Sequence, residues 1–259
     1  MNLPKVTLKL PKVTRWRAAG VHLLLSAAVA AVALALLLFV WYPPPLFVAA
    51  GGQELLFLLV GVDVIVGPLI TLIVYRAGKR GLGFDLAAIG LVQAAALIYG
   101  VGIVYLARPA FIVFAKDRFE VATAVELAPE NLAEARFDEF RRPPLFGPAL
   151  AAADYPADQA EQQRMVKLNA LGLDLQHFPK FWVPYGQRAK EILAKADSIE
   201  RLRKVDPKAA RVVDEWLAAS GTPEAAVRFV ALRAPRAWVA VLLDASSAEP
   251  VRMLVYEKL

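Results

Sequence analysis

The sequence predicts a membrane protein with a bundle of three transmembrane helices at its N-terminal end, followed by an extracytoplasmic α+β domain with an antiparallel sheet. Three observations lead to this fold class. The first hundred or so residues hold three long apolar stretches, Lys and Arg are unevenly shared among the segments between them, and short alternating runs replace continuous apolar runs after Arg108.

The three apolar stretches run from about residue 18 to 41, from 55 to 75 and from 86 to 107. Each has the roughly 20 residues with which a helix crosses the hydrocarbon core of a bilayer. A cleaved signal peptide is the alternative for the first stretch, because basic residues precede it. Its apolar run is longer than the roughly 7–15 residues of a signal peptide's apolar region, so we expect a retained anchor.

The basic residues predict the orientation of these helices. The tail of residues 1–17 and the segment between the second and third stretches are basic, whereas the segment between the first and second carries Glu54 and no base. Because Lys and Arg gather on the cytoplasmic side of membrane proteins, we expect the N-terminus in the cytoplasm and residues 108–259 on the other side. The basic residues concerned are Lys5, Lys9, Lys12, Arg15, Arg17, Arg76, Lys79 and Arg80.

The position of the positive charge excludes one class of function. The chain has a formal net charge of +6, but Lys and Arg nearly balance Asp and Glu from Arg108 onward. Nucleic-acid binding needs a basic face that neutralises phosphates, so we expect no nucleic acid as a partner. The basic residues beside the apolar stretches instead attract anionic headgroups, which makes membrane lipids expected partners.

After Arg108 the pattern predicts strands, then helices, then strands. An initial hairpin and a final three-stranded meander enclose four helical segments, an order typical of an α+β domain with an antiparallel sheet. Two further segments, 141–148 and 178–185, are expected to be loops packed over the sheet. The expected strands are 111–114, 119–125, 227–232, 238–243 and 251–256, and the expected helices are 129–135, 157–171, 188–195 and 207–219.

Asp63 is the most unusual residue of the apolar stretches, since it lies near the middle of the second one. A carboxylate at such a depth costs about 2.5–3.5 kcal/mol, so it is expected to face protein or water and to mark a functional site. Gly67, one turn later, offers a notch for the close approach of another helix. Pro68 leaves the carbonyl of Val64 without its amide partner and is expected to kink the helix.

Helix rise indicates which side chains can reach Asp63. At about 1.5 Å per residue, Tyr99 of the third stretch lies at nearly the same depth and is the better partner, whereas Gln93 is reached mainly if the helices tilt. His22 lies near the cytoplasmic boundary, which predicts that it is too far away. Asp85 begins the third stretch at the cytoplasmic face, so it cannot form the paired carboxylates of an intramembrane protease.

Two interpretations of this patch remain open. Asp63 forms an internal hydrogen bond with Tyr99 or Gln93 that fixes the bundle, or the patch around Asp63, Gly67 and Pro68 binds a helix from another protein. A proton relay is a third, weaker interpretation.

The domain after Arg108 shows no set of nucleophile, base and metal ligands, so neither enzymatic activity nor a cofactor or metal is expected. The chain has no cysteine, which excludes disulfides and thiolate chemistry. His177 is expected to be a loop or packing residue. A group of aromatic residues belongs either to the core or to an exposed contact surface for a peptide. The group is Phe178, Phe181, Trp182 and Tyr185.

Several segments together resemble the type IV pilin accessory proteins, also called the TfpX/TfpZ family. The resemblance covers most of the chain after the basic tail, but the tail's repeated Leu-Pro-Lys-Val-Thr lies outside the pattern. The segments are Trp41-Tyr42-Pro43-Pro44-Pro45-Leu46, the motif from Gly61 to Leu72, Phe84-Asp85-Leu86, Ala107-Arg108-Pro109, Leu171-Gly172-Leu173-Asp174-Leu175 and Phe181-Trp182-Val183-Pro184-Tyr185.

The resemblance implies a bacterial inner-membrane protein with a periplasmic domain, which supports pilus assembly or surface display without being a pilus subunit. It implies type IV pilin or pilus assembly components as partners and no catalytic residues. The alternative hypothesis is a membrane-anchored sensor whose outer domain binds a small ligand or peptide. The expected cytoplasmic segments are too short for a signalling domain, so a sensor would need a separate partner. Self-association into a homo-oligomer is left open.

Overall fold

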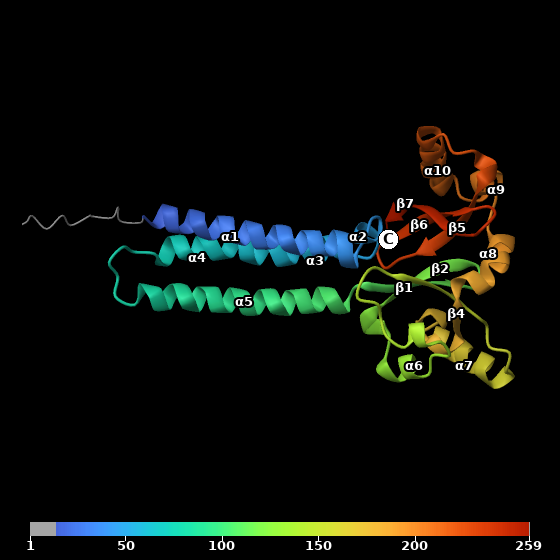
Figure 1. The fold of residues 1–259 in the computed structure, drawn as a ribbon, viewed down its shortest axis with the longest axis horizontal. Coiled ribbons are helices and arrows are strands. Elements are labelled where there is room, and N and C mark those ends of the chain that lie inside the picture. The colour runs from blue at the N-terminus through green and yellow to red at the C-terminus, as the bar shows by residue number, and fades with distance from the viewer. Residues whose placement is uncertain (1–13, 259) are drawn as a thin grey trace, which may run out of the picture. The chain divides into compact units, whose positions relative to one another are not determined.

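The computed structural model describes residues 14–258, apart from the side chains of residues 58, 59 and 62 (Figure 1). The repeated basic motif and most of the predicted tail therefore lie outside the described residues. The chain divides into two compact units. The helical unit comprises the described residues up to 34 and residues 56–102, and the sheet unit comprises residues 35–55 and 103–258.

Within residues 14–258, two helices are long and apolar enough to cross a membrane. Helix α1 (Arg15–Leu36) continues into the π-helical segment η1 (Leu37–Trp41), and α5 covers Leu82–Leu106. They correspond to the first and third predicted spans, and their exposed apolar side chains are compatible with a membrane anchor. The second predicted span is not among these candidates. It forms three consecutive helical segments, α3 (Gly52–Val60), η2 (Gly61–Val66) and α4 (Gly67–Val74).

The sheet unit is built on seven strands in the order β4-β3-β1-β2-β5-β6-β7 (Figure 1). The hairpin β1–β2 and the meander β5–β6–β7 confirm the pairings expected from the sequence. Strands β3 and β4 extend the hairpin side and were not predicted. The strands are β1 (Pro109–Ala115), β2 (Arg118–Thr123), β3 (Ala149–Ala153), β4 (Trp182–Pro184), β5 (Val227–Arg233), β6 (Ala237–Asp244) and β7 (Pro250–Lys258).

The sheet is mixed, so the prediction of an antiparallel sheet was wrong in part. Strand β1 is parallel to β3, and β2 is parallel to β5, whereas the other neighbouring pairs are antiparallel. The cause lies in the connections. Strand β2 ends where β1 begins, as the bond from the Ala124 amide to the Arg108 carbonyl shows. Strand β3 begins at this same end of the sheet after a long connection, so it runs parallel to β1. A short hairpin connection would instead make two neighbouring strands antiparallel.

Five α-helices lie in the connections between the strands (Figure 1). Four of them confirm expected helices, and α9 was not predicted as a separate helix. Asp158, Ser198 and Asp206 cap the N-termini of α7, α9 and α10 through side-chain bonds to backbone amides. The helices are α6 (Pro129–Ala133), α7 (Gln159–Asn169), α8 (Ala189–Lys195), α9 (Ile199–Val205) and α10 (Pro207–Ser220).

Residues 35–55 belong to the sheet unit. The short helix α2 (Leu46–Ala49) buries Leu46 and Ala49 in the same core cluster as the inward side chains of β1, β2, β5 and β6. The amide of Arg236 donates to the Ala49 carbonyl at 2.8 Å. The hydroxyl of Tyr42, which is fully buried, donates to the carbonyl of Val104 at 3.2 Å. The segment between the first two apolar stretches is therefore integrated into this unit.

Candidate functional site

Asp63 lies in the π-helical segment η2, which ends at Val66, two residues before Pro68. Proline has no amide hydrogen and its ring displaces the preceding turn, so the helix cannot keep regular α-helical bonds there. The structure shows a widened helix at the place where the sequence predicts a kink. Asp63 and Pro68 are both buried within the helical unit, with 8 % of Asp63 exposed.

Gln93 of α5 is the side chain that contacts the Asp63 region. Its Nε2 donates to the backbone carbonyl of Asp63 at 3.4 Å. The Gln93 amide also fills the space beside Gly67, because a Cβ atom at Gly67 would lie 2.7 Å from Cδ of Gln93. The notch at Gly67 is thus used within the chain.

Two expectations about which side chains lie near Asp63 were wrong. Tyr99 has 73 % of its surface exposed within the described residues, and Gln93 takes the place expected for it. His22 lines the same cavity as Asp63, and its Nδ1 lies 2.6 Å from Oγ1 of Thr71. The expectations assumed straight, upright helices compared by depth alone. Lateral packing and the widened η2 segment decide which side chains meet.

The cavity beside Asp63 has a volume of about 240 Å³ and opens between α1, η2 and α5. His22, Ser26 and Gln93 contribute its other polar side chains. The Oδ1 atom of Asp63 is buried and has no hydrogen-bond partner among the described residues. An unpaired buried acceptor is costly, so this atom is suited to accept a hydrogen bond from a group that enters the cavity.

An apolar groove of about 300 Å³ lies beside this cavity, and Gln93 lines both. Small residues in its wall allow the backbone of another helix to approach closely. The groove is lined by Val66, Gly67, Ile70, Ala88, Ile89, Val92, Gln93 and Ala96.

The aromatic group of the sheet unit lies mostly inside the core. Phe178, Trp182 and Tyr185 are buried, and Phe181 is half-buried. Nε1 of Trp182 donates to the Leu175 carbonyl at 2.9 Å, and the Tyr185 hydroxyl donates to the Ala248 carbonyl at 2.6 Å. The three buried side chains therefore belong to the core. Of the four aromatic residues, Phe181 alone has a partly exposed ring.

His177 has a structural role in the same region. It is 6 % exposed, and its Nδ1 accepts a bond from the Asp174 amide at 3.1 Å, which closes a cap on a short helical turn. Among the described residues, no three His, Cys, Asp or Glu side chains are grouped to hold a metal ion.

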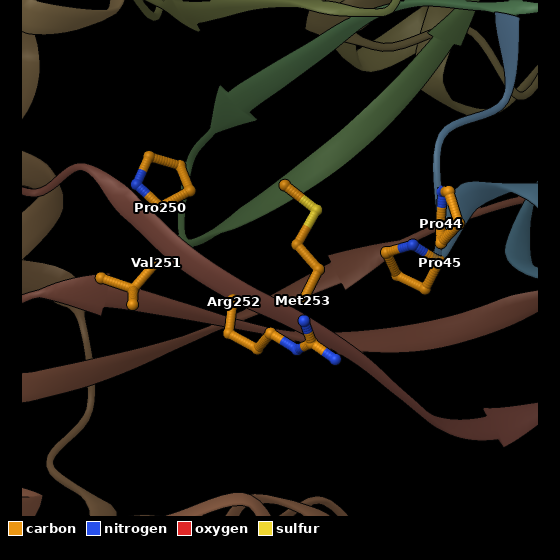
Figure 2. A pocket seen from close by; sticks show the side chains of 6 residues that line it. All are labelled: Pro44, Pro45, Pro250, Val251, Arg252 and Met253. Carbon is orange, nitrogen blue, oxygen red and sulfur yellow. The ribbon is translucent and has the colours of Figure 1, made fainter. Parts of the chain in front are cut away.

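A cavity of the sheet unit, of about 330 Å³, lies between Pro44, Pro45 and the start of β7 (Figure 2). Arg252 and Met253 leave the strand in opposite directions (Figure 2). Arg252 is the only charged residue of the lining. This cavity therefore lacks the acid and base pair that proton-transfer chemistry needs.

The fold and these sites define a class of protein with apolar helices, two of them long enough to span a membrane, and a sheet-containing domain. Residues 11–51 match the family model described as fimbrial assembly protein FimB. Two curated relatives from Dichelobacter nodosus are the fimbrial assembly proteins of serogroups I and E1. They are 32 % and 31 % identical over 178 residues, which cover 68 % of this chain and 69 % of each relative.

The fimbrial assembly protein of serogroups C1 and C2 is 38 % identical over 121 residues, which cover 46 % of this chain and 92 % of that protein. No solved structure matches the chain. The chain belongs to the family of fimbrial assembly proteins, a type IV pilus accessory family. The resemblance noted in the sequence is thereby confirmed.

Proposed function

We propose that this protein is a non-enzymatic accessory protein of type IV pilus biogenesis in the bacterial inner membrane. It assists pilin assembly or surface display through helix contacts in the membrane and through a periplasmic domain. Membership in a family whose curated relatives are named fimbrial assembly proteins supports the role in fimbrial biogenesis. The exposed apolar surfaces of α1 and α5 support the membrane location.

Three membrane crossings are part of this proposal. Segments α3, η2 and α4 follow one another from Gly52 to Val74, a length of about 35 Å at helical rise, which is enough for a further crossing. Three crossings place the N-terminus and the loop with Arg76, Lys79 and Arg80 on the cytoplasmic side. Residues 108–259 then lie in the periplasm.

The apolar groove beside Asp63 carries the proposed contact with pilin. Its occupant is the apolar helix by which a pilin is held in the membrane before assembly. Ala88 and Ala96 permit close packing of such a helix in the groove. Asp63 Oδ1 offers an acceptor in the neighbouring cavity, which shares Gln93 with the groove. Val92 and Ile70 leave part of their surface exposed along the groove.

Site-specific photocrosslinking in pilin-producing cells tests this contact. A photoreactive residue at Gly67 would clash with Gln93, so Val92, which lines the groove and is 69 % exposed, is the better position. Leu91 is the matched control, since it is 73 % exposed on the same helix and is absent from the lining. We expect pilin adducts from Val92 and few from Leu91. Equal yields from both, or none from Val92, would contradict the groove contact.

Deletion of the protein, followed by separate measurements of membrane pilin and surface pili, tests the biological role. We expect pilin to remain in the membrane while surface pili decrease. Complementation with Asp63→Leu is expected to restore little piliation, because the variant removes the free acceptor in the cavity. Full restoration by Asp63→Leu would show that a structural role of the helices is sufficient.

A further inference from the structure

The loop of residues 141–148 presents two large apolar side chains to the surface. Leu145 is 58 % exposed and Phe146 is 77 % exposed. The following residue, Gly147, has a φ of +55°, a left-handed conformation that glycine adopts easily and that turns the chain back after the apolar pair.

Hydrogen bonds fix this loop to the ends of both candidate membrane helices. The Gly147 amide donates to the carbonyl of Val40, in the last turn before Trp41, at 2.6 Å. On the other side, Arg108 Nη2 donates to the Pro144 carbonyl at 3.0 Å, and its Nη1 donates to the Tyr105 carbonyl at 2.6 Å. All of these residues belong to the sheet unit.

The loop therefore lies at the level where both apolar helices end. Trp41 and Tyr105, at the ends of the two helices, are in edge contact, with 5.4 Å between their ring centres. Trp and Tyr are the residue types enriched at membrane interfaces. Phe39, in the same helical turn as Val40, is 82 % exposed, so the helix also presents a large apolar side chain next to the residue that binds the loop.

We propose that the segment from Arg141 to Pro148 is an interfacial membrane anchor. Leu145 and Phe146 enter the boundary between headgroups and acyl chains of the outer leaflet. The exposed side chain of Arg142 lies beside lipid phosphates, for which it has the complementary charge, whereas Arg141 is paired with Asp138. The anchor holds the sheet unit close to the bilayer. This inference rests on the membrane location in the proposed function.

Labelling the full-length protein in phosphatidylcholine and phosphatidylglycerol vesicles tests the anchor. The chain has no cysteine, so Phe146→Cys creates a unique site for a fluorophore. Leu171→Cys is the matched control, because Leu171 is 78 % exposed in the same unit. Leu171 lies three residues before Asp174, which contacts Lys116 just after the last residue of β1. Arg108 precedes the first residue of β1, about 20 Å away along the strand.

We expect nitroxides carried by lipids to quench the label at residue 146 several-fold more than the label at residue 171, and an aqueous quencher to show the reverse. Leu145→Cys provides an independent site in the same loop should Phe146→Cys fold poorly. A label at residue 146 that is as open to the aqueous quencher as that at residue 171 would overturn the anchor. So would a label shielded from both quenchers, because that pattern indicates a protein contact.

A third position separates this inference from the proposed function. Ile98 of α5 is 73 % exposed within the helical unit, and Ile98→Cys reports whether that helix lies in lipid. Lipid quenching at residue 98 combined with aqueous quenching at residue 146 would refute the anchor alone. Aqueous quenching at residue 98 would refute the membrane location itself, and the anchor with it.

Discussion

Glu120 on β2 is a carboxyl group in an unfavourable environment. Its side chain is 15 % exposed, and Oε1 lies 3.3 Å from Nε of Arg118. Burial raises the pKa of Glu120 to about 7, and the nearby positive charges of Arg118, Arg233 and Lys116 offset this only in part. Between about pH 4.5 and pH 7 the folded protein therefore holds a proton that the unfolded chain, with the ordinary pKa of 4.5, has released.

The stability contributed by Glu120 accordingly falls as the pH rises from about 4.5 to about 7. We expect Glu120→Gln to raise the melting temperature at pH 8 and to have a smaller effect at pH 5, since the neutral amide avoids burying a charge. Thermal unfolding of the detergent-solubilised protein measures this. Glu139→Gln, at an exposed position, is the control. An equal effect of Glu120→Gln at both pH values would contradict the expectation.

Gly67 is the second residue with a specific steric requirement. Gly67→Ala would push the Gln93 amide away from the Asp63 carbonyl, and because this flexible side-chain end can shift, the cost is that of its lost hydrogen bond, about 0.5–1.5 kcal/mol. We expect a lower melting temperature, partly recovered in the Gly67→Ala, Gln93→Ala double variant, which removes the displaced amide. Gly102→Ala is the control, because no atom lies within 4 Å of a Cβ built there. If Gly67→Ala were as harmless as Gly102→Ala, the close packing would be wrong.

Among the elements, α10 ends in a glycine cap. Gly221 has a φ of +68°, and its amide donates to the Leu217 carbonyl. No atom lies within 4 Å of a Cβ built on Gly221 or on Gly186, and only Gly221 has a positive φ. We expect Gly221→Ala to lower the free energy of unfolding by about 1 kcal/mol through backbone strain alone. Gly186→Ala should change it little in chemical denaturation, and similar losses from both would contradict a strain effect.

Strands β3 and β4 were not predicted, because neither has the residue pattern of a strand. Strand β3 has the sequence Ala-Leu-Ala-Ala-Ala, whose residues have low strand propensity, and β4 contains only Trp182, Val183 and Pro184. Strand β3 forms because the edge of β1 offers unpaired backbone groups, and β4 then pairs with the free edge of β3. Helix α9 was missed because it is short and is separated from α10 only by Asp206.

For the whole molecule, the distribution of charge makes the strongest prediction. A reporter fused after Leu259 is expected to be active if it requires the periplasm, and inactive if it requires the cytoplasm. The reason is that basic residues flank the first and third apolar stretches on one side. A second fusion within the loop near Gly78 should give the opposite result. A fluorescent cytoplasmic reporter after Leu259 would contradict the three-crossing topology.

The sequence by itself determined the apolar helices, the hairpin and the meander, because these depend on composition and on local periodicity. It also identified Asp63, Gly67 and Pro68 as unusual, because a buried charge, a missing side chain and a missing amide are properties of single residues. The family resemblance likewise rested on local motifs.

Only the tertiary structure decided which residues meet. It placed Gln93 and His22 at the cavity beside Asp63, turned Tyr99 outward, made the sheet mixed and integrated residues 35–55 into the sheet unit. The physical reason is the same in each case. These contacts join segments far apart in the chain, and they depend on packing and on the direction of connections, which no local pattern encodes.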